Sequence, residues 1–436
     1  MNITTKRLKE LEELKELEFR PLREIRDIQE ERFQDLLKRA PPIYGRYLRE
    51  IKDLDDLTSA DFFVYKDQLR TRGRDFLAVP LTRVSRIFSS SGTTGPPTYS
   101  YFTKEDLEVL DQLAWRAMRR MESPEETFKD DIAMIDAPSG MFMLNYTMCR
   151  MAYQSGLTII NPNGTLSEIV RLLHEFNPTV YMGYLSGILS LMESFKIKGG
   201  LERLSSIRKV ILIGENLSLA RREQLRILLN RDSGGLKVYD VYGMSEVCQT
   251  LSSECKFKVG MHMAIDHVFF EVIDPITHEH SKENKGILVI TTLTKRADPL
   301  IRYWTDDYVE ISYEKCKCGR TLPRIVFVDK YRNMIRVGDE HIPPSRIEAV
   351  IFSGEFAPII IDYQAVVKGT LEEPVLTIKL RTIKRLNREQ ISSLRDMLER
   401  ALKIHVEHVE EESLTSVKRE PTRMQKRQRV IDKRRW

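Results

Sequence analysis

The sequence has no apolar run that approaches the ~20 residues needed for a membrane-spanning helix. It also has no charged-then-apolar leader before its first predicted helix. Cysteine is scarce, since only five are spread over 436 residues. An odd number in a chain of this kind argues against a disulfide framework and leaves metal binding or simple burial. These absences predict a cytoplasmic protein without a membrane partner.

A large excess of charge of one sign is missing as well. The chain has 69 Lys and Arg against 64 Asp and Glu, for a formal net charge of +5. The basic residues concentrate near the C-terminus, at Lys418-Arg419 and from Lys426 to Arg435, so a general nucleic-acid surface is not indicated. The basic tail still leaves an RNA-binding arm open as an alternative. At 436 residues the chain exceeds what one core usually supports, which predicts two domains of unequal size.

Two common nucleotide-binding fingerprints are also absent, because the chain has neither Gly-x-Gly-x-x-Gly nor a glycine loop ending in Gly-Lys-Ser/Thr. Instead, a strand-like run over residues 83–88 leads into Phe88-Ser-Ser-Ser-Gly-Thr-Thr-Gly-Pro-Pro-Thr98. Its glycines let the backbone approach a ligand, and its hydroxyls and N–H groups can surround phosphate oxygens. A run of Ser, Gly and Thr is also typical of flexible linkers, so composition alone leaves both interpretations open.

The order of apolar runs predicts an α/β fold. Residues 1 to about 57 have helical spacing, and Thr103-Lys-Glu-Asp106 has the spacing of a capping box that opens a helix. Strand-like runs at 131–136, 157–160, 180–182 and 209–213 alternate with helical segments, as in a mostly parallel sheet covered on both faces. Ligands bind beyond the carboxyl ends of such strands, where Gly214-Glu215 and Tyr242-Gly243 follow apolar runs.

The later chain predicts two smaller β-containing regions. Runs at 268–273 and 286–291 indicate a small antiparallel subdomain between about residues 260 and 313. From about residue 334, a helix at 344–351, runs at 358–361, 364–367 and 375–380, and a helix at 387–404 suit a small α+β domain of split-βαβ type. Cys255, His262, Cys316 and Cys318 could bind a metal, but their spacing alone allows buried inert cysteines equally well.

Several motifs together resemble the adenylate-forming superfamily, in its phenylacetate-CoA-ligase-like branch. They keep the family's order over nearly the whole chain: Ser90-Ser-Gly-Thr-Thr-Gly95, Gly214-Glu215, Tyr242-Gly-Met-Ser-Glu246, Pro299-Leu-Ile-Arg-Tyr-Trp-Thr-Asp-Asp307, Cys316-Lys-Cys-Gly-Arg320, Pro344-Ser-Arg-Ile-Glu348 and Lys426-Arg-Gln-Arg-Val-Ile-Asp432. The resemblance implies a large N-terminal AMP-binding domain, residues 1–329, with mostly parallel sheets and a small antiparallel β subdomain. A small mobile C-terminal α+β lid, residues 330–436, would follow.

The resemblance also implies roles for individual residues. Glu246 would bind Mg²⁺, which takes hard oxygen ligands and shares them with phosphates, and Lys426 would act at the reacting centre. Tyr242 would stack on the adenine and Asp307 would accept the ribose hydroxyls. The expected nucleotide-binding residues are Ser90, Ser91, Gly92, Thr93, Thr94, Gly95, Gly214, Glu215, Tyr242, Gly243, Met244, Ser245, Asp307 and Lys330. Cys255, His262, Cys316 and Cys318 would hold a structural Zn²⁺ that stabilises a β region at about 255–320.

This chain departs from the family's pattern at three places. Pro96 stands where lysine often follows the last glycine of the loop, so a cation expected over the phosphates is missing. Trp304 and Asp306 replace two members of a motif that usually reads Arg-Tyr-Arg-Thr-Gly/Arg-Asp. Residues 329–333 replace the usual Gly-Arg-x-Asp-Asp hinge. These changes lie at ligand-contacting positions, so they favour a catalytically impaired nucleotide-binding homologue as one alternative.

The function implied by the resemblance is ATP-dependent adenylation of a carboxylic acid, expected to be aromatic, followed by transfer of the acyl group to coenzyme A. The cofactors would be ATP, Mg²⁺, coenzyme A and structural Zn²⁺. An adenylyltransferase that acts on a deazaflavin is a second alternative, since no identified residue excludes it. The expected partners are the small acid, ATP or AMP, and coenzyme A, with a homodimer left open.

Overall fold

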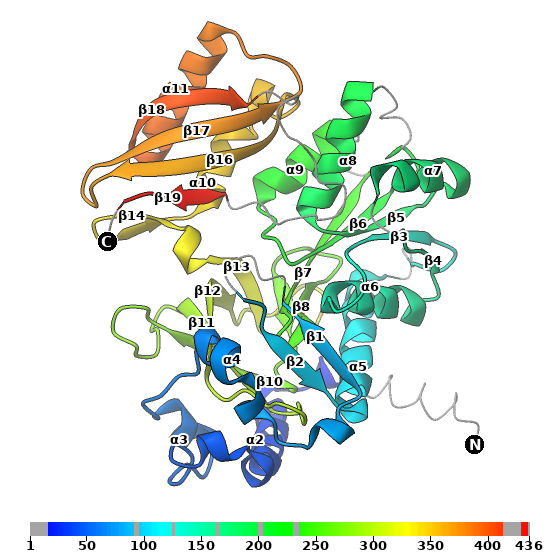
Figure 1. Cartoon of the computed structure of the whole chain (residues 1–436), viewed down its shortest axis with the longest axis vertical. Helices are drawn as coiled ribbons and strands as arrows, with labels where there is room; N and C mark the ends of the chain where they lie inside the picture. The colour runs from blue at the N-terminus through cyan, green and yellow to red at the C-terminus, as the bar shows by residue number, and fades with distance from the viewer. Residues whose placement is uncertain are drawn as a thin grey trace. The chain divides into compact units, whose positions relative to one another are not determined.

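The computed structural model describes residues 16–90, 96–123, 127–162, 165–198, 204–229, 235–412 and 429–434 (Figure 1). The chain forms two compact units. The first unit contains residues 1–131, 138–159 and 239–328, and the second contains residues 132–137, 160–238 and 329–436. Among the described helices, none combines the length and the apolar character needed to cross a membrane.

The helices of the first unit follow the amphipathic pattern of its sequence. They are α2 (Leu22–Arg39), α3 (Leu54–Thr58), α4 (Lys66–Arg72), α5 (Lys104–Met121) and α6 (Met143–Gln154), with 3₁₀ turns at Pro42–Tyr44, Gly73–Phe76 and Leu81–Arg83. Ile25, Phe33 and Leu36 form the buried side of α2. The capping box predicted at the start of α5 is confirmed, because Thr103 and Asp106 each accept a hydrogen bond from the other's backbone N–H.

The strands of the first unit pair mainly in antiparallel fashion. β1 (Arg86–Ser89) and β2 (Tyr99–Phe102) form a hairpin. The others are β7 (Lys237–Met244), β8 (Cys248–Glu254), β9 (Met261–Met263), β10 (Val268–Ile273), β11 (Lys285–Thr292), β12 (Tyr303–Ser312) and β13 (Arg324–Lys330). The first two residues of β7 and the last two of β13 are counted with the second unit. The sequence predicted antiparallel pairing only from about residue 260, but β7 already pairs antiparallel with β8. Antiparallel structure therefore covers more of the chain than expected.

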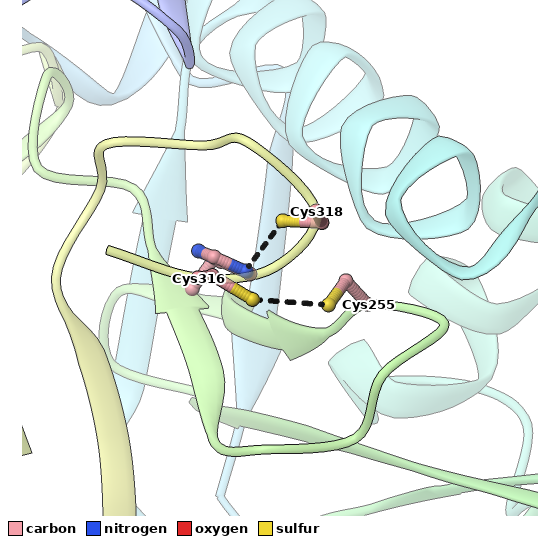
Figure 2. A group of neighbouring side chains, drawn as sticks. Cys255, Cys316 and Cys318 are labelled. Atoms are coloured by element: carbon pink, nitrogen blue, oxygen red, sulfur yellow. Dashed lines mark hydrogen bonds between the residues drawn. The ribbon is translucent and has the colours of Figure 1, made fainter. Parts of the chain in front are cut away.

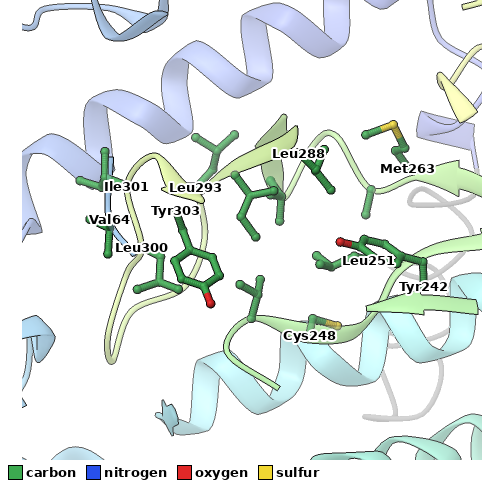
Figure 3. Packing of buried hydrophobic residues seen from close by; sticks show 14 of the residues in the cluster. Val64, Tyr242, Cys248, Leu251, Met263, Leu288, Leu293, Leu300, Ile301 and Tyr303 are labelled. Atoms are coloured by element: carbon green, nitrogen blue, oxygen red, sulfur yellow. The ribbon is translucent and has the colours of Figure 1, made fainter. Parts of the chain in front are cut away.

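One hydrophobic core holds these strands together. It includes Val64, Leu251, Leu288 and Ile301, none of which is more than 5% exposed (Figure 3). Tyr242 and Tyr303 lie in the same cluster, with each ring among aliphatic side chains. Buried tyrosines need a partner for the hydroxyl, which makes their polar ends informative about a nearby site.

The second unit contains the parallel strands that the sequence predicted. They are β3 (Ile132–Asp136), β5 (Val180–Gly183) and β6 (Lys209–Ile213). Of β4 (Thr158–Ile160), only Ile160 is counted with this unit. β3 pairs parallel with β5, and β5 pairs parallel with β6. The accompanying helices are α7 (Leu166–Phe176), α8 (Leu185–Lys198) and α9 (Leu219–Leu228). Parallel pairing brings Asp136, Gly183 and the Gly214-Glu215 turn to the same edge, as expected from the rule for such sheets.

The later part of the second unit has a core of its own. It contains β14 (Ile335–Val337), β15 (Glu340–Ile342), α10 (Pro344–Ile351), β16 (Ile360–Gly369), β17 (Pro374–Thr382), α11 (Arg388–Leu402), β18 (His405–Glu412) and β19 (Val430–Asp432), with 3₁₀ turns at Tyr331–Asn333 and Gly354–Phe356. The four-stranded sheet has the order β18-β17-β16-β19. Leu394 and Leu398 of α11 and Ile347 of α10 share a core with Ala365 and Ile378 of this sheet. The helix predicted at 344–351 is confirmed to the residue.

Two sequence-based expectations in this region are wrong in detail. The runs at 358–361 and 364–367 were expected to be separate, but they belong to one strand, β16, with an irregularity between Ile360 and Asp362. β18 was not predicted, because its alternating charged residues resemble a solvated segment. It pairs parallel with β17.

Candidate functional site

The hairpin of β1 and β2 fixes both ends of the Ser/Gly/Thr loop. Ser90 N donates to Thr98 O at 2.9 Å, and Thr98 N donates to Ser90 Oγ at 2.9 Å. Ser91, Gly92, Thr93, Thr94 and Gly95 lie outside the described residues, so their roles stay predictions. The hydrogen bonds between Ser90 and Thr98 join the two ends of the loop on a hairpin, whereas a linker would have no such closure.

Glu246 lies at the base of this turn. It is buried between β7 and β8, and its Oε1 accepts the hydroxyl hydrogen of Thr98 at 3.1 Å. The same oxygen is 2.8 Å from Lys66 Nζ. Lys295 Nζ donates to the backbone oxygen of Glu246 at 2.7 Å. A buried, oriented carboxylate beside a phosphate-type loop provides a hard oxygen ligand of the kind that Mg²⁺ takes, so the residues present fit that ion.

Tyr242 and Asp307 form a second polar pair in the first unit. The Tyr242 hydroxyl donates to Asp307 Oδ2 at 2.8 Å, and both side chains are buried. Burial, together with the charge of Asp307, raises the pKa of Tyr242 well above its usual value. The phenol therefore stays a neutral donor, which fixes the direction of the Asp307 carboxylate.

The backbone around Asp307 explains one departure from the family's motif. β12 bulges here, because Ile287 pairs with Tyr308 while Val289 pairs with Trp304. Asp306 within the bulge has a φ of 62°, which glycine adopts at least cost and aspartate tolerates better than most residues. Bulges commonly re-aim side chains at functional sites. The positive φ at Asp306 therefore suits the glycine that some family members have at this position.

Trp304 lies away from the Tyr242–Asp307 pair. Burial alternates along β12, with Tyr303, Thr305 and Asp307 buried and Trp304 and Asp306 only partly so. The Trp304 ring packs against Phe63, with centroids 5.1 Å apart, and against Tyr65 at 5.9 Å. The replacement at 304 therefore changes the packing of the segment around Tyr65 and leaves Asp307 in place.

The expected residues between Tyr242 and Glu246 lie where two strands approach closely. A Cβ on Gly243 would come within 2.3 Å of the Cys248 backbone oxygen, so only glycine fits there. Met244 pairs with Cys248 across the turn, and Ser245 Oγ accepts from Gln249 Nε2 at 3.1 Å. This close turn sets the direction in which Glu246 leaves the sheet.

The remaining expected nucleotide residues belong to the second unit. Gly214 directly follows β6 with a φ of 86°, and Glu215 Oε2 accepts from the backbone N–H of Ser186 at 2.7 Å. Lys330 is the last residue of β13, next to Asp329, whose Oδ2 accepts from Asn216 Nδ2 at 3.2 Å. Burial, reinforced by the charge of Glu348, raises the pKa of Asp329 to about 7. The hydrogen bond between Asn216 and Asp329 thus joins the turn after β6 to the start of residues 329–436 within the second unit.

Asp136 forms a buried polar pair at the edge of the parallel strands. Its Oδ2 accepts from the Tyr181 hydroxyl at 2.8 Å. A Cβ on Gly183 would come within 2.7 Å of that hydroxyl, so the strand end must be glycine. Burial raises the pKa of Asp136 to about 6, although the hydrogen bond from Tyr181 acts in the opposite direction.

This raised pKa gives a pH-dependent prediction for stability. The folded protein holds the Asp136 proton more tightly than the unfolded chain does. The stability that this contributes is full below about pH 4 and is lost as the pH rises through about 6. Asp136→Asn keeps a neutral side chain at every pH. We expect it to raise the melting temperature by several degrees at pH 8 and clearly less at pH 5, since one pKa unit corresponds to about 1.4 kcal/mol.

Thermal melts of the parent and Asp136→Asn at both pH values check this, with Asp339→Asn at an exposed position as the matched control. A gain of the same size at pH 5 and pH 8 would contradict the assignment of the pH dependence to Asp136.

Three cysteines and one histidine meet in the first unit (Figure 2). One ligand atom from each of Cys255, His262, Cys316 and Cys318 lies within 4.8 Å of the others. The Sγ atoms of Cys255 and Cys316 are 3.8 Å apart, and Cys318 Sγ is 3.3 Å from His262 Nε2. A tetrahedral Zn²⁺ with Zn–S bonds of about 2.3 Å needs sulfurs about 3.8 Å apart, so the four residues fit this ion.

A buried charge cluster supports the segments that carry these four residues. Arg120 Nη1 donates to the backbone oxygen of His262 at 2.8 Å, and Arg320 follows Cys318 by two residues. Both arginines pair with Glu18, at 2.6 Å and 2.5 Å, and Arg116 pairs with it at 2.8 Å. Burial alone would raise the pKa of Glu18, but Arg120 and Arg116 hold it well below its usual range. The first described residues of the chain are thereby fixed against the cysteine loop.

Sequence reasoning missed Lys66, Thr98 and Lys295 as neighbours of Glu246. Thr98 belongs to the Ser/Gly/Thr loop, and its hydroxyl could have been predicted to take part in the site. Lys66 and Lys295 carried no local signal, because they lie far from Glu246 in sequence and only the fold brings them to it.

Comparisons with known proteins agree with this geometry. A family model described as "AMP-binding enzyme" matches residues 68–292. Phenylacetate-coenzyme A ligase from Thermus thermophilus is 32% identical over 371 residues, which is 81% of this chain and 80% of the relative. Phenylacetate-coenzyme A ligase from Escherichia coli is 27% identical over 370 residues, covering 81% and 82% of the two chains.

A solved structure shows the same fold. 2-Hydroxyisobutyryl-CoA ligase, in its postadenylation state in complex with 2-HIB-AMP, has a TM-score of 0.79 at 20% identity, covering 93% of this chain and 88% of that one. The match of more than half of the chain to one family model, together with a relative above 30% identity over most of both chains, decides the family. The chain belongs to the AMP-binding enzymes, the adenylate-forming family that includes phenylacetate-coenzyme A ligases.

Proposed function

We propose that this chain is an AMP-forming acid–CoA ligase. It would activate a carboxylic acid with ATP and then transfer the acyl group to coenzyme A. The observation that carries the proposal is the buried Glu246 carboxylate, hydrogen-bonded to Thr98 at the base of the Ser/Gly/Thr loop. The Tyr242–Asp307 pair in the same unit adds an aromatic ring and an acceptor for a nucleoside. Relatives named phenylacetate-coenzyme A ligase support both the reaction and an aromatic acid.

In the first half-reaction, an oxygen of the substrate carboxylate attacks the α-phosphorus of ATP. A P–O bond forms to give the acyl-adenylate, and pyrophosphate leaves with the electrons of the broken bond. Asp307 would accept hydrogen bonds from the ribose hydroxyls, with Tyr242 against the base. Lys330, Gly214 and Glu215 remain proposed nucleotide-binding residues. Positioning and charge neutralisation, not covalent chemistry of the protein, are what such a step requires.

Glu246 is the proposed ligand of Mg²⁺, which when bound neutralises negative charge on the phosphates. In the second half-reaction, the thiolate of coenzyme A attacks the acyl carbon and AMP leaves, which gives a thioester. Residues 330–436 are proposed to act as the mobile lid between the two steps. Their own hydrophobic core, around Ile347, Ala365 and Leu394, supports this, because a lid must stay folded as it moves.

Pyrophosphate release tests the proposal. The purified protein, with ATP and Mg²⁺, should release pyrophosphate with at least one acid from a panel of aromatic and aliphatic acids. A thioester should form only when coenzyme A is added. Release without any dependence on acid, or no release with any acid, would overturn it.

We also propose that Cys255, His262, Cys316 and Cys318 bind one structural Zn²⁺. All four ligands come from the protein, which is typical of closed structural sites. Protein purified without added zinc should contain about one equivalent. Replacing Cys316 and Cys318 by serine should remove it and lower the melting temperature, because metal binding contributes directly to folding.

Cys149→Ser provides the matched control, since Cys149 is a half-buried cysteine outside the cluster. It should leave the metal content unchanged. Less than about half an equivalent in the parent, with the same content in the Cys316/Cys318 variant, would contradict the site.

A further inference from the structure

The phosphate loop of this chain carries no positive charge of its own. Residues 88–98 contain hydroxyls, glycines and prolines but no lysine or arginine. A bound triphosphate adds several negative charges beside Glu246, which is itself an acid. Backbone N–H groups and a divalent ion would help to balance these charges, and a fixed cation near the loop would add stabilisation that does not depend on metal.

Lys66 is a cation placed at this loop. Its Nζ is 2.8 Å from Glu246 Oε1, the same oxygen that accepts the hydroxyl hydrogen of Thr98 at 3.1 Å. Thr98 in turn closes the base of the loop with Ser90. The Lys66 side chain is 39% exposed, so it is not enclosed although it contacts the buried Glu246 carboxylate.

Lys295, the other lysine beside Glu246, is placed differently. Its Nζ donates to the Glu246 backbone oxygen at 2.7 Å and pairs with Asp298 at 2.9 Å, and its side chain is only 6% exposed. A buried lysine with a carboxylate partner orients the backbone and is not free to meet a phosphate. Lys66 is therefore the better candidate of the two.

The chain holds Lys66 in place through β12. Val64 N donates to Arg302 O at 3.0 Å, and Trp304 N donates to Val64 O at 2.8 Å, so Val64 lies alongside Tyr303 (Figure 3). The Trp304 ring packs against Phe63 and Tyr65, the residues on either side of Val64. Lys66 follows Val64 by two residues, and its Nζ lies next to Glu246.

Helix stability does not account for this lysine. Lys66 is the first residue of α4, and a cation at a helix N-terminus is disfavoured by the partial positive charge there. Its contact with Glu246 is the interaction that favours the position. If Mg²⁺ bound to Glu246, Lys66 would have to leave that carboxylate or share it. Because the charge of Lys66 is at the end of a flexible side chain, it could then contact the phosphate oxygens of the nucleotide.

We propose that Lys66 binds the phosphates of the nucleotide, and that Trp304 is a positioning residue that holds the segment presenting it. The inference rests on the proposed function, which it deepens. It also connects two of this chain's unusual residues: Pro96 leaves the loop without a cation, and Trp304 secures the segment from which another cation is supplied.

The main test compares Lys66→Ala with the parent in acid-dependent pyrophosphate release. The KM for Mg·ATP should rise about tenfold, which is what losing one charge-assisted contact costs, while the KM for the acid stays unchanged. Lys66→Arg should retain most of the affinity. Lys104→Ala, which removes an exposed lysine from the first position of α5, is the matched control and should change nothing.

Rescue by charge separates binding from structure. Pro96→Lys in the Lys66→Ala background should recover most of the affinity for Mg·ATP, because it returns a cation to the loop. An unchanged KM in Lys66→Ala would overturn the proposal. So would a defect that Lys66→Arg does not relieve and Pro96→Lys does not rescue, since that pattern indicates only a packing role.

Trp304→Ala tests the positioning role. It should raise the KM for Mg·ATP, but it should add little when Lys66 is already alanine, because the two residues act through one contact. Fully additive effects would show that Trp304 acts independently of Lys66.

Direct binding distinguishes failure of this inference from failure of the proposed function. Isothermal titration with Mg²⁺ and a non-hydrolysable ATP analogue needs no acid and no turnover. If the parent is inactive with every acid but Lys66→Ala still weakens binding about tenfold, the proposed function fails and the Lys66 inference stands. If the parent is active and both proteins bind the analogue equally, the proposed function stands and the Lys66 inference fails.

Discussion

Lys426→Ala is expected to reduce acid-dependent pyrophosphate release by about 100- to 1000-fold, the range seen when one charge that stabilises a transition state is removed. Thioester formation from a supplied acyl-adenylate and coenzyme A should stay nearly intact. The asymmetry follows from the proposed role: Lys426 meets negative charge that develops only as pyrophosphate leaves, and the second half-reaction does not need that charge.

Lys426 itself lies outside the described residues, but the chain that follows it is anchored. Ala365 N donates to Arg429 O at 2.8 Å, and Arg429 Nη1 pairs with Glu348 at 2.6 Å. β19 then pairs parallel with β16. These contacts begin three residues after Lys426, so the described chain from residue 429 onward is attached to the small sheet.

Lys433→Ala is the matched control for this prediction, because Lys433 is an exposed lysine in the same segment. It should leave both half-reactions unchanged. Equal losses in both half-reactions of Lys426→Ala would indicate a folding or docking defect. No loss in either half-reaction would show that Lys426 is a solvated surface lysine without a catalytic role.

Glu246→Gln is the second large expected effect. The variant should keep its fold and lose about 100-fold or more of the adenylation rate, because an amide cannot offer Mg²⁺ the charge of a carboxylate. The rate should also require more Mg²⁺ to reach its maximum. Magnesium titrations of pyrophosphate release by the parent and the variant measure both effects.

Glu254→Gln controls for the loss of a buried glutamate. Glu254 lies on β8 near Glu246 in sequence and accepts a hydrogen bond from the backbone N–H of Asp240 at 2.8 Å. Its replacement should affect the melting temperature more than the magnesium requirement. A Glu246→Gln variant that needs no more metal than the parent would show that another carboxylate holds the ion.

The sequence predicted best those features that depend on neighbouring residues. The capping box of Thr103 and Asp106 and the bounds of α10 follow from side chains within one or two turns. The parallel strands β3, β5 and β6 were found because buried strands are short, apolar and bounded by turns. The four members of the cysteine and histidine cluster were found by resemblance, and their spacing alone left the question open.

Features that depend on distant residues were not predictable. Asp362 interrupts the apolar run of β16 and suggested a break, but Arg221 of α9 pairs with its carboxylate and makes burial of the charge possible. Glu18 likewise reaches Arg320, about 300 residues away. The contact of Lys66 with Glu246 belongs to the same class. Such pairs become visible only when the fold has placed both members.

Acid-dependent pyrophosphate release, followed by the fate of the acyl group, tests the central claim most directly. With ATP, Mg²⁺ and a suitable aromatic acid, the protein should release pyrophosphate and hold the acyl-adenylate until coenzyme A is added. Equal amounts of AMP and acyl-CoA thioester should then appear. Pyrophosphate release that proceeds without any acid, or an acyl-adenylate that coenzyme A does not consume, would contradict the assignment as an acid–CoA ligase.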